Sequence, residues 1–131
     1  MRRILVVDDD FVSRKLMVEM LKTNAECDTA ANGTEAIEAY NYSIRHNAPY
    51  DLIILDISMP GMNGIEVLKK IRENEEKARV MVGEGIPIVV VTAYHETFLD
   101  AFNKGCDDYM LKPIKKDDLI AKIDSKLRNT R

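Results

Sequence analysis

The sequence predicts an α/β domain in which a parallel β-sheet carries helices on both faces. Five short apolar runs alternate with five amphipathic segments of helical periodicity along 131 residues. Uninterrupted apolar runs are typical of strands buried on both faces, and strand–helix alternation is typical of parallel sheets with right-handed crossovers. The length suits one domain, and no repeat, linker or low-complexity segment divides the chain.

The strands are predicted from short apolar runs that each end at a polar residue or a turn. The runs ILVV at 4–7, LIIL at 52–55 and PIVVV at 87–91 have no polar interruption, as expected of buried strands. A weaker strand precedes an Asn-Gly turn, and the last one, YML, ends at Lys112-Pro113. In chain order the strands are expected at 4–7, 26–30, 52–55, 87–91 and 109–111.

The helices are predicted from apolar residues that recur at helical spacing between the strands. Asp10 or Ser13 can cap the first helix, and the turn Asn32-Gly33 precedes the second. Gly105 lies at the C′ position of the fourth helix, where a residue of left-handed conformation closes a helix. In chain order the helices are expected at 11–21, 34–46, 64–76, 95–104 and 115–128.

The stretch DLIILDISMPGMNG at 51–64 holds the central strand and the carboxylate of Asp56. Asp56 lies where a buried strand leaves the sheet, and the segment 58–64 is dense in turn-forming residues. A carboxylate at a strand end serves about as often to cap the next helix as to perform a function. The role of Asp56 therefore depends on what lies at the ends of the other strands.

Polar residues follow four of the five predicted strands at equivalent places: Asp8-Asp9, Asp56, Thr92 and Lys112. The carboxyl ends of parallel strands meet at one edge of an open α/β sheet, and ligands bind there. If the first and third strands are neighbours, three carboxylates share one crevice, where a close pair repels by about 4 kcal/mol at an effective dielectric of about 20. A cation must offset that repulsion, and hard oxygen ligands suit Mg²⁺.

Such a crevice has the groups needed for phosphoryl transfer onto a carboxylate. Mg²⁺ keeps positions open for phosphate oxygens, Lys112 adds positive charge, and the Thr92 hydroxyl donates to the same anion. Asp56 is then the nucleophile. Each residue alone has an ordinary explanation, because the aspartates can cap a helix, Thr92 a strand end, and Lys112 can be solvated. The inference depends on all of them following equivalent strands.

The motifs VVDDD, LIILDISMPGMNG, VVVTA and DDYMLKP together resemble the receiver domain of two-component response regulators. The resemblance covers essentially the whole chain. It implies a flavodoxin-like three-layer sandwich, with a five-stranded parallel sheet in the order 2-1-3-4-5 and five helices. Residues 1–131 would then form a single receiver domain with no effector domain.

The resemblance also implies roles for the acidic residues. Asp56 accepts a phosphoryl group from a histidine kinase and becomes 4-aspartylphosphate. Asp9 binds Mg²⁺ directly, Asp8 acts mainly through water, and Ser58 offers its backbone carbonyl. Asp56 completes the metal site, for which Mn²⁺ is an alternative ion.

The same match implies how the site signals. Thr92 and Tyr109 correspond to the switch pair of the family, and Lys112 corresponds to its invariant lysine, usually followed by a cis peptide, here to Pro113. Phosphorylation then alters a partner-binding surface formed by the fourth helix, fifth strand and fifth helix. The protein would be a switch, not an enzyme, and would catalyse only its own phosphorylation and dephosphorylation.

Composition limits the partners. The net charge is −3 and no basic stripe is present, so direct DNA binding by this domain is not expected. No apolar run approaches the roughly 18 residues of a membrane span. Cys27 and Cys106 lack metal-type spacing and suit reduced thiols. We expect a cytoplasmic monomer or weak dimer, with a histidine kinase or phosphotransfer protein as donor and a downstream protein as target.

Two other classes of protein share parts of this pattern. A haloacid-dehalogenase-type phosphatase uses an Asp-x-Asp motif after the first strand, which Asp8 and Asp10 would supply, but Asp56 would then have no role. A flavin-binding module needs a hydroxyl-rich phosphate loop after the first strand, where this chain has three aspartates. A phosphate-monoester assay and a flavin absorption scan separate both from the signalling switch.

The segment 74–85 is longer than the corresponding connection of a minimal receiver domain. The third helix is expected to continue past Asn74 and to break at Gly83 and Gly85. An apolar patch at 80–82 belongs either to a mobile surface loop or to a contact with a partner or a second copy.

Tyr94 is a second departure from the pattern of the receiver family, because it is a bulky residue two positions beyond the switch threonine. By the family match, positions 58 and 94 flank the path by which water attacks the phosphoryl group. We expect the Tyr94 ring to exclude water, while Ser58 is too short to orient it. The phosphorylated state should then outlive that of fast chemotaxis-type receivers, unless Tyr94 points to solvent as part of a partner surface.

Overall fold

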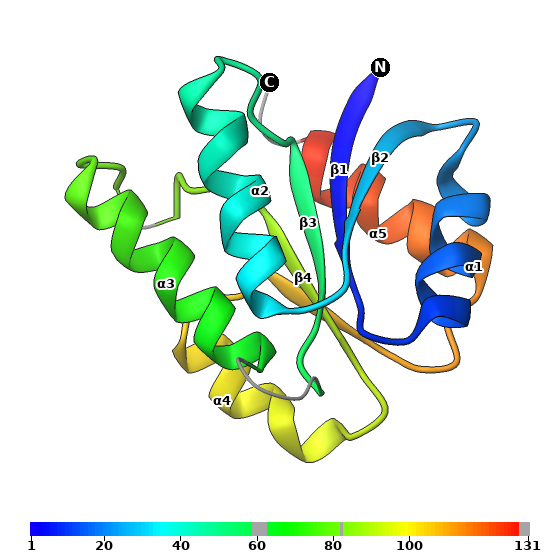
Figure 1. Cartoon of the computed structure of the whole chain (residues 1–131). Coiled ribbons are helices and arrows are strands. Elements are labelled where there is room, and N and C mark those ends of the chain that lie inside the picture. Colours follow the sequence, from blue (N-terminus) through cyan, green and yellow to red (C-terminus); the bar gives the residue numbers. More distant parts are fainter. Residues whose placement is uncertain (59–62, 82, 129–131) are drawn as a thin grey trace.

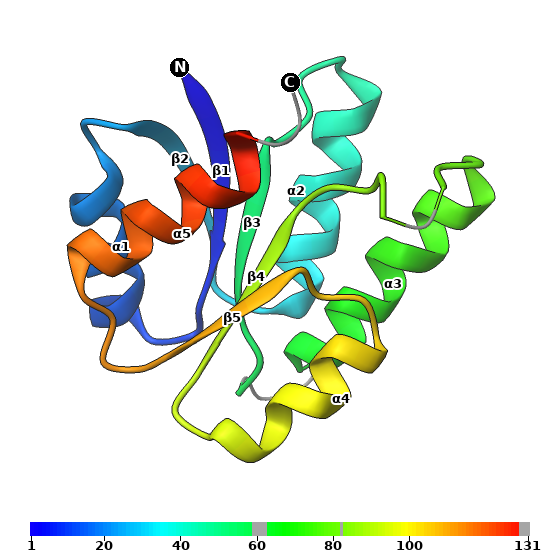
Figure 2. The same cartoon turned by 180° about the vertical axis from the view of Figure 1, so that it is seen from behind.

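Five segments of the chain form one parallel sheet in the computed structural model, which describes residues 1–58, 63–81 and 83–128. The strands are β1 (Arg2–Val7), β2 (Ala25–Ala30), β3 (Leu52–Asp56), β4 (Ile88–Thr92) and β5 (Asp108–Leu111). Their order is β2-β1-β3-β4-β5, and every neighbouring pair is parallel (Figures 1 and 2). The predicted flavodoxin-like order is confirmed.

Helices cover both faces of the sheet. On one face lie α2 (Gly33–Arg45), α3 (Gly64–Lys77) and α4 (Phe98–Asn103), and on the other lie α1 (Phe11–Leu21) and α5 (Lys116–Arg128) (Figures 1 and 2). Along β1, Leu5 and Val7 belong to the core under α2 and α3, whereas Ile4 and Val6 belong to the core under α1 and α5. All four side chains are fully buried, which explains why the strand is apolar at each position from Ile4 to Val7.

Side-chain caps define where the first three helices begin. Oδ2 of Asp10 accepts a hydrogen bond from the backbone N–H of Ser13 at 3.1 Å, so Asp10 and not Ser13 is the N-cap of α1. Asn32 and Asn63 cap α2 and α3 in the same way, each through the backbone N–H three residues later. These bonds satisfy N–H groups that have no partner inside the helix.

The helix predicted at 95–104 is divided. Residues His95–Thr97 form a 3₁₀ turn, and α4 itself spans six residues. Within this turn, the Thr97 hydroxyl donates to the Tyr94 carbonyl at 2.8 Å, and no side chain caps the α-helix that follows. The predicted C-terminus is confirmed, because Gly105 has φ of 107° and its N–H donates to the Phe102 carbonyl.

The connection from α3 to β4 differs from the prediction in its helix stop. The helix continues past Asn74, as expected, but ends at Lys77, before Gly83 and Gly85. Arg79 has a left-handed φ of 64° and closes the helix as a glycine usually does. In the predicted patch at 80–82, the first two residues are exposed, and residue 82 lies outside the described residues, as do 59–62 of the predicted turn.

Candidate functional site

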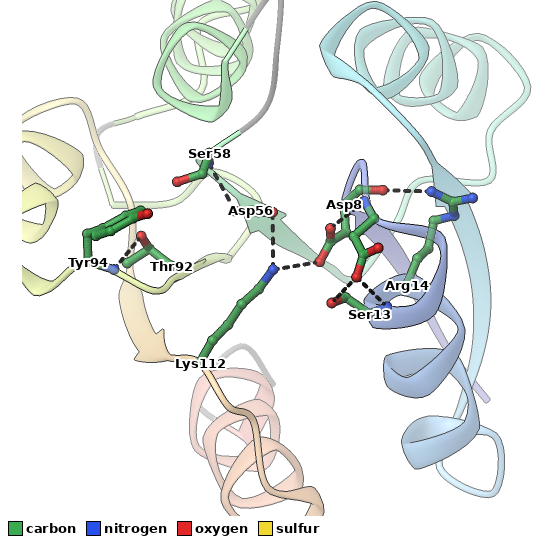
Figure 3. Close-up of polar contacts among 9 residues, drawn as sticks. Asp8, Ser13, Arg14, Asp56, Ser58, Thr92, Tyr94 and Lys112 are labelled. Atoms are coloured by element: carbon green, nitrogen blue, oxygen red, sulfur yellow. Dashed lines mark hydrogen bonds and ion pairs between the residues drawn. The ribbon is translucent and has the colours of Figure 1, made fainter.

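The candidate site lies where the carboxyl ends of four strands meet. Asp8 follows β1, Asp56 is the last residue of β3, Thr92 is the last residue of β4, and Lys112 follows β5. Because β1 pairs with β3, and β3 with β4, the first three residues are brought to one edge of the sheet. Figure 3 shows the Lys112 side chain reaching between Asp8 and Asp56.

Lys112 joins the two buried carboxylates of the site. Its Nζ lies 3.1 Å from Oδ2 of Asp8 and 3.3 Å from Oδ2 of Asp56. The side chain of Lys112 is 26% exposed, so the ammonium reaches the crevice from its rim. The peptide between Lys112 and Pro113 is cis, as the family resemblance implied.

Each carboxylate is also held by a backbone N–H group two residues further along the chain. Oδ1 of Asp56 accepts from the N–H of Ser58 at 3.0 Å, and Oδ1 of Asp8 accepts from that of Asp10 at 2.9 Å. Asp8 is fully buried and Asp56 is 3% exposed. A buried carboxylate is tolerated only when such donors replace water. Here each carboxylate has its own backbone N–H donor, and the two share the ammonium of Lys112.

The charges in the site are not balanced. The pKa of Asp56 is raised, because burial and the neighbouring Asp8 raise it by more than the Ser58 N–H and Lys112 lower it. Burial lowers the pKa of Lys112, but the carboxylates of Asp56 and Asp8 outweigh burial, so its pKa is raised and the ammonium stays charged. One ammonium therefore faces several carboxylates, and a further cation would be favoured.

Three carboxylates are close enough to share a metal ion. Asp8, Asp9 and Asp56 each offer an oxygen, and these atoms all lie within 4.8 Å of one another. Asp9 is exposed, whereas the other two are buried, so the set opens to solvent on one side. An all-oxygen donor set with an open side fits Mg²⁺, which keeps several of its water ligands.

Asp10 does not join this cluster, although the sequence places it beside Asp9. Its Oδ2 accepts from the backbone N–H and from the hydroxyl of Ser13, at 3.1 and 2.7 Å. These bonds from Ser13 hold the pKa of Asp10 below its ordinary value. The Asp-x-Asp pair of a haloacid-dehalogenase-type phosphatase is therefore not assembled, because Asp10 faces its own helix.

Thr92 is fully buried beside the carboxylates. Its Oγ1 accepts a hydrogen bond from the backbone N–H of Tyr94 at 3.0 Å, so its own proton can donate to an anion in the crevice. Its backbone carbonyl accepts from the N–H of Lys112 at 2.8 Å, which ties the end of β4 to the residue that follows β5.

Tyr109 of β5 lies outside the crevice, and its ring packs against α4. Its ring centroid is 3.5 Å from that of Phe98 and 5.5 Å from that of Phe102, and the residue is 37% exposed. Tyr94 is 55% exposed, and Figure 3 shows it on the same side of Asp56 as Ser58 and Thr92. The two residues of the predicted switch pair are thus separated, with Thr92 in the site and the ring of Tyr109 packed against α4.

The sequence reasoning missed several supporting residues. Arg14 on α1 donates to the backbone carbonyl of Asp8 at 2.8 Å, and Phe98 and Phe102 hold the ring of Tyr109. The spacing of the two phenylalanines, four positions apart in a predicted helix, was a usable signal. A single arginine in an amphipathic helix gives no comparable signal, because most such residues are solvated.

A family model described as the response regulator receiver domain matches residues 4–124. The chain is 37% identical over 131 residues to the DNA-binding response regulator MtrA of Mycobacterium tuberculosis, covering 97% of this chain and 51% of that protein. It is 33% identical over 131 residues to the response regulator ArlR of Staphylococcus aureus, covering 98% and 53%. The chain therefore spans about half the length of these relatives.

Solved structures agree with the fold. A CheY-like response regulator receiver domain protein from Methanospirillum hungatei has a TM-score of 0.82 at 28% identity, covering 99% of this chain and 96% of that one. The response regulator TrrA of Thermotoga maritima, solved in complex with Mg²⁺-BeF, has a TM-score of 0.78 at 37% identity, covering 97% and 100%. Within the described residues, no helix is long and apolar enough to cross a membrane. The chain belongs to the response regulator receiver domain family of two-component signalling.

Proposed function

We propose that Asp56 accepts a phosphoryl group from a phosphohistidine of a sensor kinase or phosphotransfer protein, and that the phosphorylated form changes a partner-binding surface. In the transfer, a bond forms between phosphorus and a carboxylate oxygen of Asp56 while the bond from phosphorus to the histidine nitrogen breaks. The observation that carries the proposal is the 3.3 Å contact of a buried Asp56 with Lys112, beside two further carboxylates.

The residues of the crevice have separate tasks in this proposal. Asp56 is the nucleophile, and the Ser58 N–H fixes one of its two oxygens. Lys112 shifts from bridging two carboxylates to contacting the incoming anion, and the Thr92 hydroxyl donates to the same oxygens. Positioning and charge stabilisation supply most of the rate, as in other phosphoryl transfers.

The metal site completes the charge balance. Asp9 and Asp56 would hold Mg²⁺, or Mn²⁺, directly, Asp8 would act mainly through water, and Ser58 would add its backbone carbonyl. When bound, the ion neutralises charge that develops on the transferred group. The exposed position of Asp9 and the spacing of the three carboxylates support this assignment.

An exposed apolar surface next to the site supports a protein as the donor. Phe11, Val12 and Leu16 of α1 are each more than half exposed. A cleft of about 400 Å³ runs between α1 and the residues after β5, and Lys112 lines both this cleft and the carboxylate crevice. Apolar side chains exposed at the mouth of a site suit a partner that must bring a phosphohistidine to it.

The proposed output partner is a downstream protein, and DNA binding is considered for this domain only. Two relatives are named as response regulators, one of them DNA-binding, and this chain matches about half of each. The expectation that residues 1–131 do not bind DNA themselves therefore concerns this domain alone. A cytoplasmic location, a downstream protein target and a monomeric or weakly dimeric state are the remaining parts of the proposal.

The direct test is incubation with acetyl phosphate and Mg²⁺, followed by intact mass measurement. The protein should gain one phosphoryl group, and Asp56→Asn should gain none. Asp100→Asn, which alters an exposed carboxylate on α4, is the matched control and should react like the wild type. Equal uptake by Asp56→Asn would overturn the assignment of the acceptor.

A further inference from the structure

Arg72 on α3 contacts three residues at the end of the sheet opposite the carboxylate crevice, one on α3 itself and two between α4 and β5. Its Nε donates to the carbonyl of Gly105 at 2.9 Å, and its two terminal nitrogens contact Glu75 at 2.7 Å and Asp107 at 2.9 Å. The guanidinium supplies donors in a fixed planar fork, so three partners can be held in one geometry. The side chains of Arg72 and Glu75 are 22% and 10% exposed, which limits competition from water.

The carboxylates of Glu75 and Asp107 also accept hydrogen bonds from backbone N–H groups at the start of β4. Oε2 of Glu75 accepts from the N–H of Ile86 at 2.7 Å, and Oδ2 of Asp107 accepts from the N–H of Ile88 at 2.7 Å. Gly85 is needed for this contact, because a Cβ there would lie 2.2 Å from a Glu75 carboxylate oxygen. The segment before β4 is therefore fixed to α3 through Glu75.

The contact with Gly105 holds one end of α4. Gly105 has φ of 107°, and a Cβ there would lie 3.0 Å from Cγ of Arg72, so the close approach suits glycine on both counts. The N–H groups of Gly105 and Cys106 donate to the carbonyls of Phe102 and Ala101, which closes the helix in a Schellman motif. The Gly105 carbonyl in turn accepts the hydrogen bond from Nε of Arg72.

The other end of α4 has fewer restraints. Neither the 3₁₀ turn nor α4 has a side-chain cap at its first residue. Leu99 is 74% exposed and Tyr94 is 55% exposed. This less restrained end is the N-terminal one, which follows Thr92 in the chain. Phe98 at this end packs against the ring of Tyr109.

We propose that Arg72 is a positioning residue of the switch: it fixes the C-terminal end of α4, so that phosphorylation moves the N-terminal end of the helix about a pivot at Gly105. The inference rests on the proposed function, because phosphorylation of Asp56 supplies the bias that moves Thr92. The anchor lies at the end of the sheet opposite Asp56, and Glu75, Gly85 and Asp107 belong to it together with Arg72. The segment before β4 is thereby coupled to the switch.

The test replaces the anchor without leaving a buried charge unpaired. The double variant Arg72→Gln, Glu75→Gln keeps the net charge, and the amide at 75 can still accept from Ile86. Lys70→Gln, Glu73→Gln is the matched control, with the same charge change and the same spacing on exposed positions of α3. Amide hydrogen exchange is followed in all three proteins, with and without beryllofluoride and Mg²⁺.

In the wild type, beryllofluoride should change exchange at 95–102, whereas the amides of Lys104, Gly105 and Cys106 keep their protection. In the anchor variant without beryllofluoride, those three amides should exchange about tenfold faster, since a charge-assisted hydrogen bond has been removed. The amides of β1 and β3 should keep wild-type rates, which a general loss of stability would not allow. Adding beryllofluoride to the anchor variant should then change the whole of α4.

Two results would overturn the anchor. Wild-type protection of Gly105 and Cys106 in the variant would show that Arg72 does not hold the helix. A wild-type response to beryllofluoride that includes both ends of α4 equally would show that no pivot exists. Phosphoryl uptake from acetyl phosphate is measured in the same samples: failure of uptake would overturn the proposed function, whereas normal uptake with either result above would overturn the anchor alone.

Discussion

Nζ of Lys112 lies 3.3 Å from Oδ2 of Asp56, and the same nitrogen lies 3.1 Å from Oδ2 of Asp8. Lys112→Met should slow phosphoryl uptake from acetyl phosphate by at least about 100-fold, because a preorganised donor to the transferred anion is lost. Intact mass at successive times measures the rate. Lys115→Met, at an exposed position three residues further on, is the control and should leave the rate unchanged. An equal rate in the Lys112 variant would remove this residue from the proposed mechanism.

Mg²⁺ should raise the melting temperature of the wild type, because an ion that binds only the folded state stabilises it by mass action. Asp9→Ala should lose most of this rise, and Asp8→Ala should lose less. Asp10→Ala is a sharp control: its carboxylate is bonded to Ser13 and lies outside the cluster, so the rise should persist. A melting temperature that does not respond to Mg²⁺ in the wild type would count against the metal site.

Beryllofluoride, a phosphoryl mimic, should change the NMR signals of the Tyr109 ring. Thr92 would move toward the mimic, and Tyr109 would leave Phe98 and Phe102 for the space beside Thr92. The ring of Tyr42, which stacks on His46 at the C-cap of α2, gives an internal control that should not change. Signal changes confined to the crevice, with none at Tyr109, would contradict the switch.

Much of the site could be predicted because it follows from strand ends. A parallel sheet brings the carboxyl ends of its strands together, so polar residues directly after apolar runs must converge, and Asp8, Asp56, Thr92 and Lys112 do so. The role of Asp10, in the same acidic run, was ambiguous in the sequence. Asp10 lies one position after Asp9, and there its side chain caps α1 instead of facing the crevice.

The remaining features depend on packing between distant segments, which periodicity does not encode. The contact of Arg72 with Gly105 joins residues 33 positions apart, and nothing near either residue in the sequence indicates the other. The division of the helix at 95–104 into a 3₁₀ turn and an α-helix is not visible in the apolar spacing of this segment. Arg79 was likewise missed, because a left-handed residue at a helix end is usually glycine.

The free energy of unfolding should fall as the pH rises from about 9 to about 12. Burial raises the pKa of Cys106 to about 11, and burial together with a hydrogen bond to Asp28 raises that of Tyr50 to about 12. Both groups bind their protons more tightly in the folded protein, so their contribution is complete below the unfolded pKa values and is lost as the pH rises through the folded ones. Urea unfolding at successive pH values measures the fall.

Single substitutions test whether Cys106 and Tyr50 cause this alkaline fall in the free energy of unfolding. Cys106→Ala and Tyr50→Phe should each make the free energy of unfolding less dependent on pH in the alkaline range. Tyr42→Phe removes a hydroxyl from a side chain that is 57% exposed and should leave the dependence as in the wild type. An identical pH dependence in all four proteins would show that the buried thiol and phenol are not its cause.

The lifetime of the phosphorylated state should depend on Tyr94. Its backbone N–H donates to Oγ1 of Thr92 at 3.0 Å, so movement of Thr92 toward the phosphoryl group breaks or shifts a bond that positions Tyr94. The ring is 55% exposed in this structure, and Figure 3 shows it on the same side of Asp56 as Ser58. We expect the ring to cover the phosphoryl group once Thr92 has moved, and to exclude the water that attacks in line.

Tyr94→Glu should therefore shorten the lifetime several-fold, since it removes the ring and adds a carboxylate that can orient water, and about 1.4 kcal/mol of barrier corresponds to a tenfold change in rate. The protein is phosphorylated, the donor is removed, and decay is followed by intact mass. Tyr94→Phe should decay like the wild type, because the ring remains. His95→Glu places the same charge at the next position, where the side chain is 79% exposed, and should also decay like the wild type. Equal decay in Tyr94→Glu and the wild type would show that the ring stays in solvent and that some other group sets the lifetime.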